Sequence, residues 1–306
     1  MKKILKKIIP QKIYNKYLLY VYKKREKLSF EDIENIISER YYKEFNRKLS
    51  WDNPKTYTEK TNVSKVYGFK DEKRKQLTDK YLVRDWVENK IGKEYLIPLY
   101  GAYNSFDEID FNKLPDKFVI KCNHDSGSVT LCNDKSKLDL KKLKYKYDKF
   151  YLKRNFAYIG YEMHYKDIEP KILIEKYMGD KIRDYKFLCF DGKPYYCWVD
   201  FDRFGNHKRN FYDMNWKLQP FNQYSYGNFD KDVKKPKQFE EMKKIAEKLS
   251  SGFDHVRVDL YLIEDKIYFG EMTFTNGNGF EKITPDDWDY KLGKLWNLKD
   301  NRSKNN

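Results

Sequence analysis

Arg257, Asp259 and Glu271 are the residues whose types and spacing best suit phosphate and metal chemistry. Arg257 and Asp259 are two residues apart in a run that alternates apolar and polar residues as a strand does, so both side chains face one side. A second predicted strand, residues 267–273, follows a short turn and brings Glu271 across from Asp259. Facing carboxylates repel unless a cation lies between them, and rigid oxygen ligands beside phosphates suit Mg²⁺. Arg257 would bind phosphate oxygens.

The competing interpretation of this hairpin is a surface element whose charges face water. Apolar residues alternate with the charged ones and indicate that the opposite face is buried; they are Val256, Val258, Leu260, Phe269 and Met272. On these residues alone, both a metal site and a solvated hairpin stay open.

Lys121 ends a short apolar run and precedes a polar segment that contains Ser126, Gly127 and Ser128. A glycine-containing turn with exposed N–H groups beside a lysine can hold phosphates. Its spacing is not that of a Walker A loop. An ordinary turn in a lysine-rich chain is the alternative.

Glu175 follows three apolar residues, and its carboxylate could accept a hydrogen bond from an adenine amino group while the backbone of Tyr177 and Met178 contacts the ring edge. Asp184 and Lys186 share a strand face, which suits a ribose hydroxyl and a phosphate. The alternatives are an edge-strand charge that deters aggregation at Glu175, and a weak ion pair between Asp184 and Lys186.

The predicted elements around these residues are short strands and helices in alternation. Strands are predicted at 95–101, 118–121, 129–131, 171–178, 184–190, 195–200, 256–263 and 267–273, and helices after Ser29, over 78–90, 138–151 and 239–249, and from Thr284. Strand pairs alternating with helices indicate an α+β fold and not a doubly wound parallel sheet. A chain of 306 residues is expected to form two or three packed sub-domains.

Together these motifs resemble the ATP-grasp superfamily, and within it the TupA-like (teichuronopeptide synthesis) branch. The matching stretches are NPKTYTEK (53–60), DKYLVR (79–84), LPDKFVIK (114–121), DYKF (184–187), FGEMTF (269–274) and GFEK (279–282). The resemblance implies an ATP-grasp fold in which two α+β sub-domains clamp ATP, behind a helical N-terminal region. We predict a basic amphipathic leader at 1–28, an N-terminal α/β region at 29–115, a central sub-domain at 116–180, and a C-terminal sub-domain with the metal site at 181–306.

The resemblance also implies a role for each candidate residue. Lys121 and Lys186 would contact phosphates, Glu175 and the backbone of Lys176, Tyr177 and Met178 would hold adenine, Asp184 the ribose, Asp259 and Glu271 Mg²⁺, and Arg257 the transferred phosphate. The sequence departs from the family at Thr273, where many relatives have asparagine. Threonine is a weaker metal ligand, so Asn276, Asn278 or a water is expected to supply the third contact.

The activity that the resemblance implies is ligation of a carboxylate to an amine, with ATP and Mg²⁺ as cofactors and Arg257, Lys121 and Lys186 as catalytic residues. The carboxylate is activated as an acyl phosphate. The family's association with cell-surface polysaccharide suggests a uronic acid such as glucuronate, free, nucleotide-linked or in a glycan, as that substrate.

Two other function classes compete. Asp200 and Asp202 form an Asp-x-Asp, which in glycosyltransferases holds a metal and a nucleotide sugar. The formal net charge of +16 attracts polyanions, but the charges are spread along the chain and no nucleic-acid motif is present, so nucleic acid is not an expected partner.

Residues 1–27 are rich in lysine, with apolar residues at Ile4, Ile8, Ile13, Tyr17 and Val21. This pattern fits a basic helix on an anionic membrane surface, but a solvated helix docked on the protein is the favoured interpretation. The four cysteines form no Cys-x-x-Cys pair, no signal-peptide cleavage site follows, and no run approaches the ~20 apolar residues of a membrane span. We therefore expect a cytoplasmic protein, with peripheral membrane contact as an option.

Overall fold

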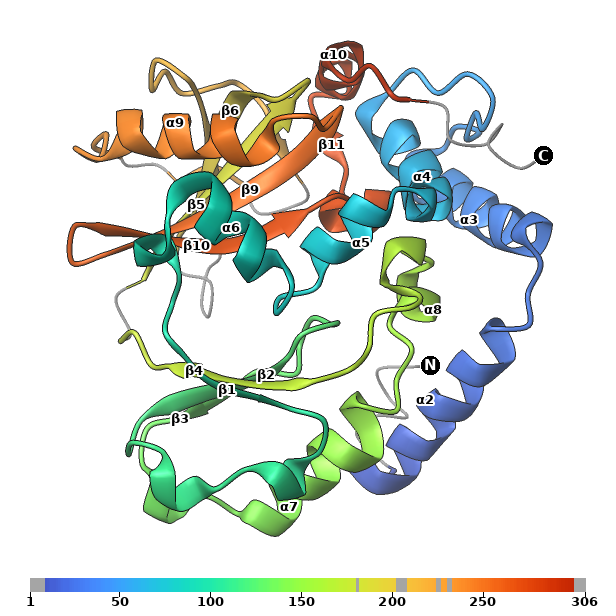
Figure 1. The fold of residues 1–306 in the computed structure, drawn as a ribbon. Helices are drawn as coiled ribbons and strands as arrows, with labels where there is room; N and C mark the ends of the chain where they lie inside the picture. The colour runs from blue at the N-terminus through green and yellow to red at the C-terminus, as the bar shows by residue number, and fades with distance from the viewer. Residues whose placement is uncertain (1–8, 180–181, 202–207, 224–226, 230–232, 300–306) are drawn as a thin grey trace.

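The computed structural model describes residues 9–179, 182–201, 208–223, 227–229 and 233–299. Two antiparallel sheets lie one above the other, with helices on their outer faces and along one side (Figure 1). The strand orders are β1-β4-β2-β3, β10-β9-β5-β6-β7 and, for a small third sheet, β11-β8. This arrangement confirms the predicted α+β class.

The four-stranded sheet consists of β1 (Leu99–Tyr103), β2 (Phe118–Cys122), β3 (Thr130–Cys132) and β4 (Ile172–Lys176). Phe118, Ile120 and Ile174 pack with Leu143 and Tyr147 on its outer face, where α7 (Leu140–Lys146) lies. Because side chains alternate along a strand, Lys121 and Glu175 lie on the inner face, toward the larger sheet.

The five-stranded sheet consists of β5 (Arg183–Phe190), β6 (Lys193–Phe201), β7 (Lys208–Asp213), β9 (His255–Ile263) and β10 (Lys266–Thr273). Its outer face packs against α9 (Phe239–Ser250) through residues such as Phe187 and Val258. Lys186 pairs in register with Asp259, so the polar residues of both strands share the other face. The apolar core therefore lies on one face of the sheet, and the candidate site residues lie on the other.

The remaining helices frame the two sheets. They are α2 (Gln11–Arg25), α3 (Phe30–Phe45), α4 (Tyr57–Tyr67), α5 (Glu72–Thr78), α6 (Val83–Ile91), α8 (Ala157–Gly160) and α10 (Asp287–Leu295). Short 3-10 helices lie at Gly68–Lys70, Lys93–Tyr95, Phe106–Glu108, Phe111–Lys113, Lys135–Lys137, Met163–Tyr165 and Asn276–Gly279, and a π-helical turn at Tyr147–Tyr151. The Ser29 and Asp32 capping box that was predicted at the start of α3 is confirmed.

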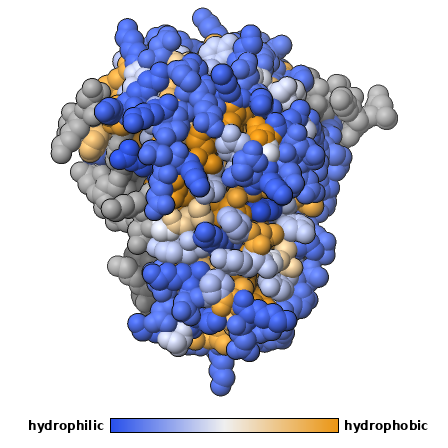
Figure 2. Space-filling view, turned by 60° about the vertical axis from the view of Figure 1, so that its left-hand side comes forward, coloured by the Kyte–Doolittle hydropathy of each residue, from blue (hydrophilic) through white to orange (hydrophobic). Residues whose placement is uncertain are grey.

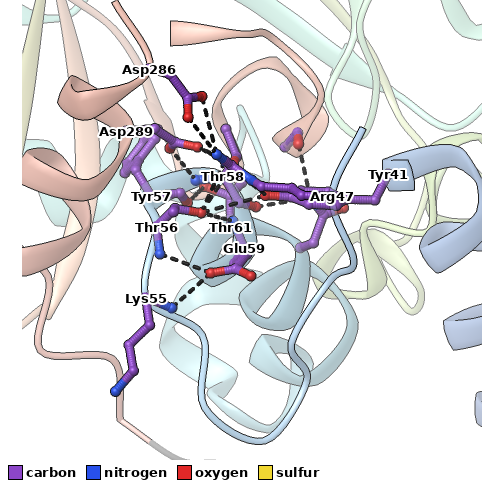
Figure 3. A network of polar contacts seen from close by, with 12 residues as sticks. Tyr41, Arg47, Lys55, Thr56, Tyr57, Thr58, Glu59, Thr61, Asp286 and Asp289 are labelled. Atoms are coloured by element: carbon purple, nitrogen blue, oxygen red, sulfur yellow. Dashed lines mark hydrogen bonds and ion pairs between the residues drawn. The ribbon is translucent and has the colours of Figure 1, made fainter. Parts of the chain in front are cut away.

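A buried polar network joins the N-terminal helices to the end of the chain (Figure 3). Asp289 of α10 accepts hydrogen bonds from the backbone N–H of Thr58 at 2.9 Å and from its hydroxyl at 2.6 Å, and it forms an ion pair with Arg47. Thr56 and Glu59 form the capping box that begins α4. Residues 53–60 therefore connect the N-terminal helices to α10, and their role there is structural.

Several predicted boundaries are wrong. The helix predicted over 78–90 begins only at Val83, as α6, because the Asp79 carboxylate accepts the Tyr81 N–H at 2.7 Å in the turn that separates α6 from α5. Thr284 does not cap a helix: it lies in β11 (Ile283–Thr284), paired with β8 (Asn222–Gln223), and α10 begins at Asp287. The helix predicted over 138–151 begins at Leu140. It is α-helical up to Lys146 and forms the π-helical turn over the remaining residues.

The predicted domain boundaries stay a prediction, although β1 joins the four-stranded sheet from the N-terminal side of the boundary at 115. In the described part of the chain, no helix combines the length and the hydrophobicity that crossing a bilayer requires.

Candidate active site

The inner face of the five-stranded sheet carries a cluster of opposite charges, all buried except Glu271, which is 39% exposed. The Arg257 guanidinium donates to both Asp259 oxygens, at 2.6 and 2.7 Å, and to Glu271 Oε1 at 2.8 Å. Lys186 Nζ donates to Asp259 at 2.7 Å and to Asp184 at 2.5 Å. Five of the predicted site residues, drawn from three strands, therefore converge, and Asp259 and Glu271 face the same side of the sheet as predicted.

The charges of this cluster set its ionisation. Burial raises the pKa of the Glu271 carboxyl, but Arg257, Lys80 and Lys186 outweigh burial and lower that pKa to about 2. Burial lowers the pKa of Lys186, and Asp259 and Asp184 reverse this, so the net pKa is raised. Burial raises the pKa of the Asp259 carboxyl, against the opposing effect of Arg257 and Lys186. Glu271 is therefore ionised and Lys186 protonated at neutral pH, which suits the binding of metal and phosphate.

Lys121 and Glu175 form the matching pair on the four-stranded sheet. Lys121 Nζ lies 2.6 Å from one Glu175 oxygen, and Arg84 of α6 lies 3.8 Å from the other. Glu175 is buried, whereas Lys121 keeps part of its surface exposed. A nucleotide could draw the lysine toward its phosphates, since the ion pair already holds the side chain at this face.

The predicted phosphate loop divides into a fixed base and an exposed tip. The Ser128 hydroxyl accepts the Cys122 N–H at 2.8 Å and donates to Asp125 at 2.6 Å, so it serves the loop itself. Ser126 and Gly127 are exposed. Gly127 has a φ of +90° with open space where a side chain would lie, which suits a loop whose backbone approaches a ligand.

The predicted adenine-binding segment, Lys176 to Met178, connects the two sheets. The Lys176 N–H donates to Pro98 O at 2.9 Å, and its side chain is exposed, while Tyr177 and Met178 are half-buried. Met178 lines a cavity of about 570 Å³ together with Arg183 and Leu262. On the face of the molecule toward the β9–β10 hairpin, hydrophobic side chains gather between two hydrophilic halves (Figure 2).

Lys80 is a site residue that the sequence analysis missed. Its amino group donates to Asp125 O at 2.7 Å in the phosphate loop, and its charge helps to lower the pKa of Glu271 on the other sheet. The half-buried Tyr165 lies near the same groups: burial raises the pKa of its phenol, the charges of Glu162, Glu271 and Asp125 raise it further, and Arg257 lowers it. The loop of the first sheet and the charge cluster of the second therefore lie close together. Lys80 is part of the 79–84 motif that carries the family resemblance, but the helical pattern of this segment gave no reason to assign the lysine to the site.

The oxygen atoms around Arg257 fit a magnesium site in their chemistry. Asp259 and Glu271 supply two carboxylates, and the Asn276 amide oxygen lies 2.6 Å from Arg257 Nη1. The Thr273 hydroxyl donates to Glu271 at 3.1 Å. The side chains of both asparagines already have partners, but Asn276 contacts the Arg257 that binds the two acids, whereas Asn278 contacts Lys65 and Glu162, so Asn276 is the better placed third ligand. Among the described residues no group of three His, Cys, Asp or Glu side chains is already gathered for a metal, because Arg257 lies between the acids.

The Asp-x-Asp of the competing glycosyltransferase hypothesis is only partly described. Asp200 is bonded to Arg209 Nε at 2.7 Å on β7, so its carboxylate has a structural partner. Asp202 lies outside the described residues.

Solved structures that are similar to this chain include two D-alanine–D-alanine ligases and a carboxyaminoimidazole synthetase. A D-alanine–D-alanine ligase from Bacillus anthracis complexed with ATP is 16% identical, with a TM-score of 0.41 over 65% of this chain and 55% of that one. The D-alanine–D-alanine ligase from Helicobacter pylori is 16% identical, with a TM-score of 0.39 over 72% and 61%. An N5-carboxyaminoimidazole synthetase from Staphylococcus aureus is 14% identical, with a TM-score of 0.39 over 65% and 44%. The chain thus spans about half the length of these structures.

No curated protein sequence matches the chain. The sequence profile of the TupA-like ATP-grasp family matches residues 59–297, more than three quarters of the chain, and this match contains every candidate residue described above. The chain belongs to the TupA-like ATP-grasp family.

Proposed function

We propose that this protein is an ATP-dependent ligase that joins a carboxylate to an amine. The observation that carries the proposal is the Arg257 guanidinium, which bridges Asp259 and Glu271 beside Lys186, in a chain of the ATP-grasp family. These groups are the anionic ligands and cations that a bound triphosphate with its metal requires.

In this proposal a carboxylate oxygen of the substrate attacks the γ-phosphorus of ATP, and the bond to the bridging oxygen breaks to release ADP. The amine then attacks the acyl carbon and phosphate leaves with the C–O electron pair, while the amine proton passes to solvent. Lys121, Lys186 and Arg257 bind the phosphoryl oxygens, orient the γ-phosphate and offset its charge.

Mg²⁺, held by Asp259, Glu271 and Asn276, would neutralise phosphate charge when bound. Arg257, which now contacts both acids, would bind phosphate oxygens when the metal takes its place between them. Glu175 and the backbone of Lys176–Met178 hold the adenine, and Asp184 the ribose. Ser126 and Gly127 cover the phosphates through their backbone N–H groups.

The proposed carboxylate is a uronic acid, such as glucuronate, in the biosynthesis of capsular or other cell-surface polysaccharide. The net charge of +16 supports an acidic sugar or sugar nucleotide as substrate. The amine is an amino acid, amino alcohol or amino sugar. The proposal places the protein in the cytoplasm, where ATP is available, with peripheral contact at the membrane through its N-terminal helix.

The test is a panel of uronates and amines mixed with ATP, Mg²⁺ and the full chain, with ADP release and product mass as readouts. One uronate and amine pair should release ADP and give an amide whose mass equals the sum of the substrates minus water. The Asp259→Asn variant should lose this activity, whereas Asp200→Asn should keep it. Sugar transfer without ADP release, abolished by Asp200→Asn, would instead establish a glycosyltransferase.

A further inference from the structure

The N-terminal helix α2 carries an outward stripe of apolar and basic residues. Ile13, Tyr17 and Tyr20 are 58%, 55% and 57% exposed, and their spacing of four and three residues places them on one helix face. Lys16, Lys23 and Lys24 are also exposed and share this spacing, and the exposed Lys27 follows in the turn after the end of α2. We define these seven residues as the α2 stripe.

The stripe is not a core face that lacks its partner, because the opposite side of α2 already packs on the protein. Tyr22 and Asn15 are buried, and Arg25 donates to the carbonyls of Tyr158 and Ile159 at 3.0 and 3.1 Å. The helix is therefore anchored at its inner side, along the outer edge of the molecule (Figure 1). The side chains of the α2 stripe therefore point away from the protein, toward solvent.

Exposed apolar surface is concentrated in this part of the chain. Of the sixteen large hydrophobic residues that are exposed in the described ranges, six lie between residues 13 and 42. A groove of about 690 Å³ runs between α2 and α3 beside the stripe, and Arg25 and Arg40 line it together with aromatic rings such as Tyr14 and Tyr161. Such a patch marks an interaction surface.

We propose that the α2 stripe and its groove bind the surface of an anionic phospholipid membrane. Residues 1–27 contain ten basic residues and one acidic residue, so the surface complements negative headgroups. Tyrosine and isoleucine on a basic helix lie at the headgroup level, and the exposed lysines of the stripe match lipid phosphates. This inference rests on the proposed function, which places the protein in the cytoplasm with peripheral contact at the membrane, and it names the surface that makes this contact.

A second copy of the chain is a poorer occupant of the stripe. A two-fold interface places the same surface of both copies together, so the four lysines of one stripe would meet those of the other. The like charges would repel, since α2 itself contains no acidic residue to offset them. An anionic bilayer has no such conflict.

The test is co-sedimentation of the full chain with vesicles of phosphatidylcholine alone or with 30% phosphatidylglycerol, without ATP. Binding is expected to the mixed vesicles alone, and to fall about tenfold or more between roughly 0.1 and 0.5 M NaCl because salt screens the charges. The Lys16→Glu/Tyr17→Ser variant should bind the mixed vesicles at least about tenfold more weakly, since each lysine near the surface contributes substantially to the free energy of binding. Tyr290→Ser/Lys291→Glu on α10, with the same types of change at exposed positions, should bind as the unchanged chain does.

Three results would overturn the proposal. They are absence of binding to the mixed vesicles at low salt, equal weakening in the α10 variant, and self-association in solution that the stripe variant abolishes. Circular dichroism and thermal unfolding of both variants show that the fold is kept. ADP release in solution is measured separately, so loss of membrane binding and failure of the ligase proposal are distinguished.

Discussion

Glu271 lies directly opposite Asp259 because β10 contains a bulge at Gly270. Phe269 pairs with Leu260, and the next pair is Glu271 with Asp259, so one residue is skipped on β10. A regular ladder would pair Glu271 with Val258, whose side chain belongs to the buried apolar face. The bulge therefore turns the second carboxylate toward the site.

The bulge also explains why residue 270 is glycine. A Cβ there would lie 3.0 Å from the Asp259 carbonyl oxygen and 3.1 Å from the Tyr261 ring. Gly270→Ala should push β10 from β9 by a few tenths of an ångström and separate the two acids, lowering kcat for ADP release by roughly 10- to 100-fold. Gly252→Ala is the control: its φ of +90° makes the change costly for stability, but its turn precedes β9 and contains none of the site residues, so kcat should stay unchanged. Equal kcat losses in both variants would contradict the role of the bulge.

Arg257→Lys should lower kcat by about 10²–10³ although the charge is kept. A lysine cannot reproduce the planar fork that now contacts Asp259 twice and Glu271 once. Single-turnover ADP release at saturating ATP measures the effect. The same change at the exposed Arg40 should leave kcat unaltered. Full activity of Arg257→Lys would show that the site needs only a positive charge there.

The network in Figure 3 offers a matched pair of substitutions, because Asp289 and Asp286 both bind Arg47. Asp289 is 1% exposed and also accepts two hydrogen bonds from Thr58, whereas Asp286 is 72% exposed. Asp289→Ala should lower the free energy of unfolding by about 3–5 kcal/mol, and Asp286→Ala by about 0–1 kcal/mol. Urea unfolding measures both values. Similar costs for the two variants would mean that burial does not decide the strength of this junction.

The sequence contained the β9–β10 site because each relationship there is local. Alternation places Arg257 and Asp259 on one face, and a tight turn returns the chain to Glu271. Lys121 and Glu175 were likewise found at the ends of apolar strands. The positions of these residues depend on local neighbours, except that the face of Glu271 is set by the bulge at Gly270, which strand alternation does not predict.

The missed features depend on partners that are distant in the chain. Asp79 interrupts its helix while its carboxylate also accepts from Asn123, 44 residues away, and that contact holds Lys80 at the phosphate loop. Thr284 resembles a helix cap, but it pairs in a sheet with Asn222. β7 was not predicted since its sequence, KRNFYD, has little apolar alternation and forms a strand by pairing with β6. Tertiary contacts overrode local preference at each of these places.

The buried His164 gives a prediction for the pH dependence of stability. Burial, aided by the charge of Arg74, lowers the pKa of His164 to about 3, so the ring is neutral in the folded protein at neutral pH. An unfolded histidine titrates near ~6.5, and the unfolded chain therefore binds one more proton between these values. Stability contributed by the neutral ring is fully present above pH ~6.5 and is lost as the pH falls, by up to about 1.4 kcal/mol per pH unit.

His164→Leu removes this proton and keeps an apolar side chain beside Tyr165 and Phe274. Between pH 6 and pH 4.5, the free energy of unfolding of the variant should fall less steeply with pH than that of the unchanged chain. The two slopes should differ by the amount that corresponds to one bound proton. Urea unfolding at four pH values measures both slopes, and the difference between the two proteins at pH 7 to 8, where the ring is neutral in both states, supplies the control. Parallel curves across the whole range would mean that His164 is protonated in the folded protein.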